Sequence, residues 1–272
     1  MEGRLDYNPL RPRLPRHQFL IQRERAHLMT GCMHAPTNEA SQEGISELMK
    51  SRTTMYDLLA RVYHKEVDEN FLAELRAMRY PQNSDNSQVN EAFRRIYAYL
   101  RHAPEDVLDE LAVDYGLVFL GAGKLNPEAA YPYESVYTST HALLMQEARD
   151  EALAIYRSQG IDKNESWKDP EDHIALELEF MATMSRRTAQ AMRDANDDAA
   201  RSLIATQHGF MTHHLLNWVP RFLVDVPRYA RTDFYKAFAQ LTGAFLSDDL
   251  ELIEDIAHSS GIELAQGGET NA

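Results

Sequence analysis

Apolar residues recur at steps of three and four along most of this chain, the spacing that places them on one face of an α-helix. Leu48, Tyr56, Leu59 and Tyr63 illustrate the pattern. No stretch alternates apolar and polar residues around Asn-Gly or Asp-Gly turns, so little indicates a β-sheet. Only 12 glycines and 11 prolines interrupt 272 residues, fewer than in an average chain. We therefore expect an all-α protein.

The periodic segments are separated by short polar breaks, which predict where the helices begin and end. The polar stretch 159–168 divides them into halves of about 45–158 and 169–257, so we expect a helical bundle of two halves joined by a hinge. Such a hinge could let two copies exchange halves and form a homodimer. Residues 258–272 are expected to be a flexible tail. Helices are predicted over about 45–63, 71–78, 89–100, 107–119, 135–157, 170–194, 197–218 and 232–257.

Residues 1–44 differ in charge from the rest of the chain. The first 30 residues carry six arginines and three carboxylates, whereas the whole chain has a formal charge of −14. A basic arm on an acidic body can bind an anionic partner or fold back on the body. The composition equally fits a disordered tail without a role. We expect a flexible extension, which could shield an acidic groove while no partner is bound.

Charge and composition exclude several classes of function. A net charge of −14 repels nucleic acid, whose binding requires neutralised phosphates, and attracts basic peptides. Cys32 is the only cysteine, so neither an intrachain disulfide nor a cysteine zinc site can form. No apolar run approaches the roughly 18 residues of a membrane span, and the N-terminus lacks the apolar core of a secretory signal. We expect a cytoplasmic protein without stable membrane insertion.

The segment from Asp169 to Glu177 (DPEDHIALE) is the most informative one. Pro170 suits the first position of a helix, with Asp169 as N-cap and Asp172 close to a capping box; this explains Asp172 without any function. His173 and Glu177 lie one turn apart on the same helix face. They could be a buried polar pair, metal ligands or contacts for a bound peptide, but two ligands are too few for zinc. We expect no metal site.

Aromatic residues gather around a second region, 114–137, which contains a loop with glycine and proline. Aromatic rings with polar tips at a loop suit a recognition surface, although Phe119 and Tyr137 could simply belong to the core. No glycine pattern of a nucleotide-binding loop occurs, so no cofactor is expected. No GxSxG motif occurs either. The aromatic residues in question are Tyr115, Phe119, Tyr131, Tyr133 and Tyr137.

Five segments in a fixed order support a resemblance to a known family. They are DYGLVFLG, YPYESVY, DPEDHIALELEFM, HHLLNWVPRF and DFYKAFAQLTGAFL, within residues 45–257. In order and spacing they resemble the TorD/DmsD family of cytoplasmic chaperones, which mature molybdenum-containing redox enzymes. The resemblance implies an all-α binding protein rather than an enzyme. Its partner would be the precursor of a molybdopterin-containing oxidoreductase, whose twin-arginine signal peptide or folded body it holds until the cofactor is inserted, before export.

The resemblance also implies site residues, carried over by their place in these motifs. They are Asp172, His173, Tyr115, Pro132, Tyr133, Ser135 and Tyr63. This chain has Tyr115 and Tyr133 where some relatives carry tryptophan, and Glu134 where some carry glycine. These differences affect which signal peptide the site would prefer, and not the way in which it binds.

The chemistry of a twin-arginine signal peptide fits the residues of this chain. Such a peptide has a basic region followed by an apolar region. The basic region would be attracted by the acidic body, with Asp172, Glu134 and Glu177 as local candidates. The apolar region needs a groove lined by aromatic side chains. Three residues could supply that groove: Tyr115, Phe119 and Tyr133.

Two alternatives compete with a signal-peptide chaperone. The first is a metal-dependent hydrolase that uses Asp172, His173 and Glu177. The second is an assembly factor that docks only on a folded enzyme subunit. If Asp172 is a helix cap, replacing it by alanine should cost about 0.5–2 kcal/mol. If His173 contacts a peptide, replacing it should weaken binding with little change in the melting temperature.

Overall fold

The computed structural model describes residues 38–81, 84–123 and 128–264, with side chains from residue 43 onward. Most of the predicted N-terminal extension and the end of the predicted tail lie outside these residues. The first described helix begins at Asn38, seven residues before the expected Ile45. The last described helix ends at Ser259, close to the expected end at Ala257.

The prediction of an all-α protein is confirmed, since the described residues form helices and no β-strand. Side chains cap several helix starts: Asp68 accepts a hydrogen bond from the Phe71 amide at 2.9 Å, and Asn86 and Asn196 act in the same way. The helices are α2 (Asn38–His64), α3 (Glu69–Ala77), α4 (Ser87–His102), α5 (Val107–Phe119), α6 (Glu134–Thr138), α7 (Glu147–Ser158), α8 (Ile174–Arg193), α9 (Asp197–Phe210), the π-helix η1 (Met211–Leu215), α10 (Leu216–Tyr229) and α11 (Asp233–Ser259).

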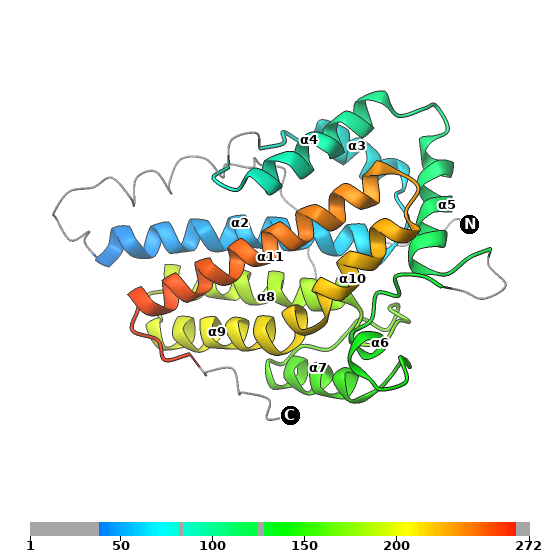
Figure 1. Cartoon of the computed structure of the whole chain (residues 1–272). Coiled ribbons are helices and arrows are strands. Elements are labelled where there is room, and N and C mark those ends of the chain that lie inside the picture. The colour runs from blue at the N-terminus through cyan, green and yellow to red at the C-terminus, as the bar shows by residue number, and fades with distance from the viewer. Residues whose placement is uncertain (1–37, 82–83, 124–127, 265–272) are drawn as a thin grey trace, which may run out of the picture.

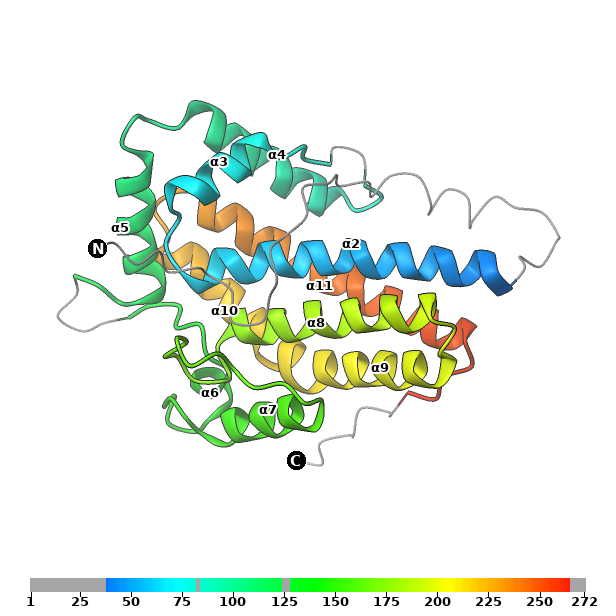
Figure 2. The ribbon, with the colours of Figure 1, turned by 180° about the vertical axis from the view of Figure 1, so that it is seen from behind.

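The helices from the two predicted halves are packed together rather than apart. Helix α2 lies along α8, and α4 lies along α11, so each pair joins one helix before residues 159–168 to one after them (Figures 1 and 2). The buried apolar residues form one continuous core with members from both sides of that stretch. The division into two halves is therefore not confirmed.

The predicted hinge is itself held against this core. Ile161 and Trp167 are buried, and the Trp167 ring stacks on His64 at 4.0 Å between ring centroids. The segment is thus anchored by its apolar residues, although most of its other residues are exposed. Exchange of halves between two copies stays a prediction.

The single helix predicted over 135–157 is wrong, because the structure divides it. Helix α6 ends at Thr138 and α7 begins at Glu147. Between them, Ala142 and Met145 have positive φ angles of 51° and 58°, which a right-handed helix cannot include. The apolar residues of this loop are also exposed. They therefore provide no buried face that would hold a helix together.

The single helix predicted over 197–218 also differs from the structure. Helix α9 ends at Phe210, the π-helix η1 follows, and α10 continues through Pro220 and Pro227 to Tyr229. The chain changes direction between α9 and α10, as Figure 1 shows. A π-helical segment is a common cause of such a bend, and so is a proline, because it has no amide hydrogen to donate.

Two buried carboxylates connect distant helices. Asp114 of α5 accepts hydrogen bonds at 2.8 Å from the amides of Arg231 and Thr232, between α10 and α11. This fixes α5 and the neighbouring Tyr115 against the bundle. Asp249 of α11 binds the guanidinium of Arg52 of α2 at 2.5 and 2.8 Å, with both side chains buried.

Every helix in the described ranges is too short or too polar to cross a lipid bilayer.

Candidate functional site

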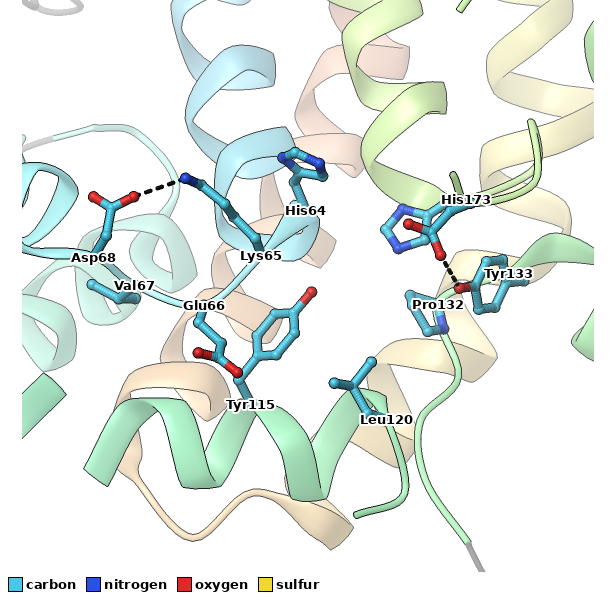
Figure 3. Close-up of a pocket in the computed structure, with 11 residues that line it drawn as sticks. His64, Lys65, Glu66, Val67, Asp68, Tyr115, Leu120, Pro132, Tyr133 and His173 are labelled. Atoms are coloured by element: carbon cyan, nitrogen blue, oxygen red, sulfur yellow. Dashed lines mark hydrogen bonds and ion pairs between the residues drawn. The ribbon is translucent and has the colours of Figure 1, made fainter. Parts of the chain in front are cut away.

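A pocket of about 430 Å³ lies where the end of α2 faces the end of α5 and the segment before α6 (Figure 3). Glu66 and Tyr115 lie on one side of it, whereas Pro132, Tyr133 and His173 lie on the other. The lining combines aromatic, apolar and charged side chains. The residues are His64, Lys65, Glu66, Val67, Asp68, Tyr115, Leu120, Pro132, Tyr133, Asp169 and His173.

Backbone pairing brings two of the predicted motifs together at this pocket. Tyr133 and His173 form an isolated antiparallel β-bridge. The amide of Ile174 donates to the carbonyl of Pro132 at 2.9 Å, and the amide of Glu134 donates to the carbonyl of Asp172 at 3.0 Å. The YPYESVY and PEDH segments are therefore neighbours, although about 40 residues separate them in sequence.

His173 is the N-cap of α8, which corrects the predicted helix start at Pro170. Its Nδ1 accepts a hydrogen bond from the Ala175 amide at 3.0 Å, and the helix begins at Ile174. The ring also lies edge-on to Tyr133 and Trp167. The prediction that Asp169 and Asp172 cap this helix is wrong. The backbone reaches helical geometry only after His173.

Asp172 organises the loop beneath the pocket instead of lining it. The side chain is fully buried, and its Oδ2 accepts a hydrogen bond from the Ser135 amide at 2.9 Å. The Ser135 hydroxyl in turn accepts one from the Gln146 amide at 3.1 Å. Asp172 and Ser135 therefore connect the start of α8 to α6 and to the loop before α7.

Glu134 and Glu177 are buried behind the pocket, where they contact the HHLLNW segment. Glu134 Oε2 lies 2.8 Å from Nδ1 of His214, and Glu177 Oε2 accepts a hydrogen bond from Nε1 of Trp218 at 3.0 Å. Burial raises the pKa of Glu177 well above its usual range, and the charges of Glu134 and Asp172 raise it further. Three of the five motif segments thus meet in one buried polar network around these carboxylates.

Tyr63 and Phe119 belong to the core under the pocket. The Tyr63 hydroxyl is hydrogen-bonded to that of Thr242 at 2.8 Å, and the ring meets that of Phe119 edge-on. Both side chains are almost fully buried. The hydroxyl of Tyr115, by contrast, donates to the Tyr63 carbonyl at 2.9 Å while its ring lines the pocket.

Of the ten predicted site residues, four line the pocket and six lie behind it. Those in the lining are Tyr115, Pro132, Tyr133 and His173. Those behind it are Tyr63, Phe119, Glu134, Ser135, Asp172 and Glu177.

Sequence reasoning missed the part of the lining that comes from the end of α2. The charged run from His64 to Asp68 follows directly after the periodic apolar pattern, which is the one signal that could have drawn attention to it. Lys65 Nζ and Arg61 Nη2 both bind Asp68 Oδ2 at 2.9 Å. Asp68 is therefore neutralised, and Lys65 is engaged in the same ion pair.

The remaining charge of the pocket is negative. Burial lowers the pKa of His64 to about 3, and repulsion from the protonated form of His173 lowers it further. Burial also lowers the pKa of His173 to about 4, although the charge of Asp169 opposes this shift. Both rings are therefore uncharged at neutral pH.

Two acidic residues account for that negative charge. Within the described ranges, neither Glu66 nor Asp169 forms an ion pair with a cationic side chain. Asp169 Oδ1 accepts a hydrogen bond from the Tyr133 hydroxyl at 2.7 Å. Burial, together with this bond, raises the pKa of Tyr133. A cationic group that enters the pocket therefore meets two carboxylates that have no counterion among the described residues.

Asp172, His173 and Glu177 do not form a common metal centre in this structure. Asp172 binds the Ser135 amide, His173 Nδ1 is occupied by the Ala175 amide, and Glu177 binds Trp218. Across the described part of the chain, no three histidine, cysteine or acidic side chains are arranged to hold an ion together.

Comparison with known proteins identifies the family. A sequence model of the family described as "Nitrate reductase delta subunit" matches residues 82–224, more than half of the chain. A chaperone protein TorD of Photobacterium profundum is 32% identical over 163 residues, which cover 57% of this chain and 72% of that protein. The chain belongs to the TorD family.

Other TorD proteins match over a longer range at lower identity. The chaperone protein TorD of Vibrio cholerae serotype O1 (strain El Tor Inaba N16961) is 26% identical over 215 residues, 77% of this chain and 94% of that protein. That of Shewanella piezotolerans is 28% identical over 224 residues, 78% of this chain and 96% of that protein. The TorD relatives are named as chaperones and not as enzymes, as the resemblance implied.

Proposed function

We propose that this protein is a cytoplasmic chaperone for the maturation of a molybdenum-containing oxidoreductase, and that it binds the signal peptide of that partner in the pocket between α2, α5 and α6. The observation that carries the proposal is the pair of carboxylates without a counterion, Glu66 and Asp169, beside an aromatic and apolar wall in the described part of the chain. Membership in a family of proteins named as chaperones supports the same role.

The two parts of the pocket match the two parts of a twin-arginine signal peptide. Guanidinium groups of the basic region would bind Glu66 and Asp169, because a charge-assisted hydrogen bond to a carboxylate is stronger than a neutral one. Tyr133 fixes the orientation of Asp169 through its hydroxyl. Apolar side chains of the peptide would pack on Tyr115, Leu120 and Pro132, which line the same pocket.

The buried residues from the motifs have a supporting role in this proposal. Asp172 and Ser135 hold the segment that carries Pro132 and Tyr133, and His173 fixes the start of α8 beside Asp169. Glu134 and Glu177 join this segment to η1 and α10. Asp172, Ser135, Glu134 and Glu177 act as positioning residues for the pocket and make no direct contact with the peptide, whereas His173 also lines the pocket.

An affinity purification from the native host, grown anaerobically and analysed by mass spectrometry, tests the partner. The proposal expects a molybdenum oxidoreductase precursor with its twin-arginine signal still attached. The Glu66→Gln/Asp169→Asn variant should recover much less of it, whereas Glu74→Gln should recover as much as the unaltered protein, because Glu74 is exposed on α3 outside the pocket.

The other outcomes contradict the proposal in different ways. Recovery of a signal-less or mature subunit, equally with the pocket variant, would indicate an assembly factor that docks on a folded subunit. Recovery of no oxidoreductase, under conditions where the candidate partner is expressed, would leave the chaperone role without support.

A further inference from the structure

The N-terminal residues of this chain have the same order of chemistry as the peptide proposed to bind in the pocket. Residues 10–23 contain four arginines and no carboxylate, and the apolar run Phe19-Leu20-Ile21 begins three residues after Arg16. The remainder of the chain is strongly acidic. A basic group followed by an apolar group is therefore covalently attached to a protein whose pocket is proposed to bind that combination.

We propose that residues 11–21 of the same chain occupy this pocket when no client is bound, with the arginines at Glu66 and Asp169 and the apolar run against Leu120 and Pro132. This regulatory role rests on the proposed function, because it makes the segment a competitor of the signal peptide. Charge complementarity supports the pairing, since both carboxylates lack a cationic partner among the described residues.

The length of the chain permits this contact. The pocket lies at the His64 end of α2, and residue 38 lies at the opposite end of that helix (Figure 1). A helix of 27 residues spans about 40 Å at 1.5 Å per residue. The chain from Arg16 to Asn38 can extend to about 70 Å. Arg16 and Phe19 can therefore reach the pocket, whereas Leu28, with about 33 Å of chain, cannot.

Covalent attachment makes even a weak contact effective. A tethered segment has an effective concentration on the order of 1 mM. A segment with an intrinsic dissociation constant of about 0.1 mM would then fill the pocket roughly nine-tenths of the time. The apparent affinity for a client would fall about tenfold. A client that binds more tightly than the segment still displaces it.

Photo-crosslinking tests the contact without a client. Benzoyl-phenylalanine replaces Phe19 in the full chain, and after irradiation the crosslinked residues are mapped by mass spectrometry. The expected result is an intramolecular crosslink to the stretch 115–120 or to residues 132–133, in a species with the mass of one chain. The same analogue at Leu28 is the matched control and should not reach either stretch.

Arginine substitution tests whether the contact depends on charge. The R11Q/R13Q/R16Q variant should lose most of the crosslink from position 19, and so should Glu66→Gln/Asp169→Asn. Glu74→Gln should not. Circular dichroism and thermal denaturation of the arginine variant should show that the fold of the described residues is retained.

Competition connects the segment to client binding. A synthetic signal peptide should suppress the crosslink, and it should bind the R11Q/R13Q/R16Q variant about tenfold more tightly than the unaltered chain. A crosslink that joins two chains, a crosslink outside the pocket, or equal peptide affinity in both proteins would overturn this inference. If the signal peptide binds but no crosslink forms, the inference is overturned and the proposed chaperone role stands. Failure of the peptide to bind either protein would instead contradict the proposed function.

Discussion

At the scale of single residues, the acidic side chains of the motifs differ sharply in their surroundings. Glu177 is buried, hydrogen-bonded to Trp218 and close to other carboxylates, so its pKa is raised. Asp169 is partly exposed beside the pocket. Residue type alone could not distinguish these cases, because burial depends on contacts with α10 and η1, which are remote in sequence.

The buried carboxyl of Glu177 predicts a pH-dependent effect of Glu177→Gln. A raised pKa in the folded state means that folding favours the protonated form, so this stabilising contribution is present below the unfolded pKa of about 4.3 and is lost as pH rises. Glutamine keeps an acceptor for Trp218 without a charge. The free energy of unfolding of the Glu177→Gln variant should therefore increase relative to that of the wild type as pH rises from about 5 to 8.

Urea denaturation at several pH values measures this effect. The exposed Glu151 is a suitable control, since Glu151→Gln should leave the difference from wild type constant across the pH range. A Glu177→Gln variant that is equally destabilised at every pH would contradict the assignment of a buried, proton-favouring carboxyl.

At the scale of helices and loops, the N-cap of α8 provides the next prediction. His173→Ala should lower the free energy of unfolding by about 0.5–2 kcal/mol, because the Ala175 amide loses its acceptor. His173→Asn should retain most of the stability, because asparagine is a good N-cap residue. This replaces the expectation that the melting temperature of His173→Ala would hardly change.

The pH dependence of the same variants provides a separate test. The pKa of His173 is about 4 in the folded protein and about 6.5 in an unfolded chain. The unfolded state therefore binds more protons between these values, and wild-type stability falls as pH falls through this window. His173→Asn should show a smaller fall than wild type. Equal slopes from pH 6.5 to 4, measured by thermal denaturation, would argue against a buried neutral histidine.

The sequence predicted most helices because their apolar faces are buried. The pattern ending at Leu100 and the pattern from Val107 to Phe119 both match helices of the structure. It failed over 135–157, where the apolar residues of the loop are exposed and two residues adopt left-handed geometry. It also missed Glu66 in the pocket, because a charged helix end does not reveal which distant loop lies opposite.

At the scale of the whole molecule, the Arg52–Asp249 pair connects the first and last described helices through the core. Asp249 also accepts a hydrogen bond from the Tyr56 hydroxyl at 2.5 Å. Asp249→Ala would leave a buried guanidinium without its counterion and should cost about 3–5 kcal/mol. Because apolar side chains can replace both charges, the R52M/D249L double variant should lose less than the single variant.

Chemical denaturation of the single and double variants checks this prediction. Glu251→Ala, at an exposed position of the same helix, is the control and should change stability by less than about 0.5 kcal/mol. A double variant that is as unstable as Asp249→Ala would show that the pair contributes through its specific geometry and not through charge compensation.

The oligomeric state is a further property of the whole molecule. Exchange of halves through residues 159–168 predicts a concentration-dependent dimer, because two copies must meet. Multi-angle light scattering over a wide concentration range should then show a second species of twice 31.1 kDa. A monomer at every concentration would exclude the exchange, in agreement with a segment anchored by Ile161 and Trp167.

The central claim is that an acidic and aromatic pocket binds a basic and apolar peptide, and calorimetric titration with a synthetic twin-arginine signal peptide tests it most directly. The R11Q/R13Q/R16Q background removes the competition that we propose for the N-terminal segment of the chain. In that background, Glu66→Gln/Asp169→Asn should weaken binding about tenfold or more, equivalent to about 1.4 kcal/mol, whereas Glu74→Gln should not change it. Unchanged affinity in the pocket variant, or no binding to the background protein, would contradict the account.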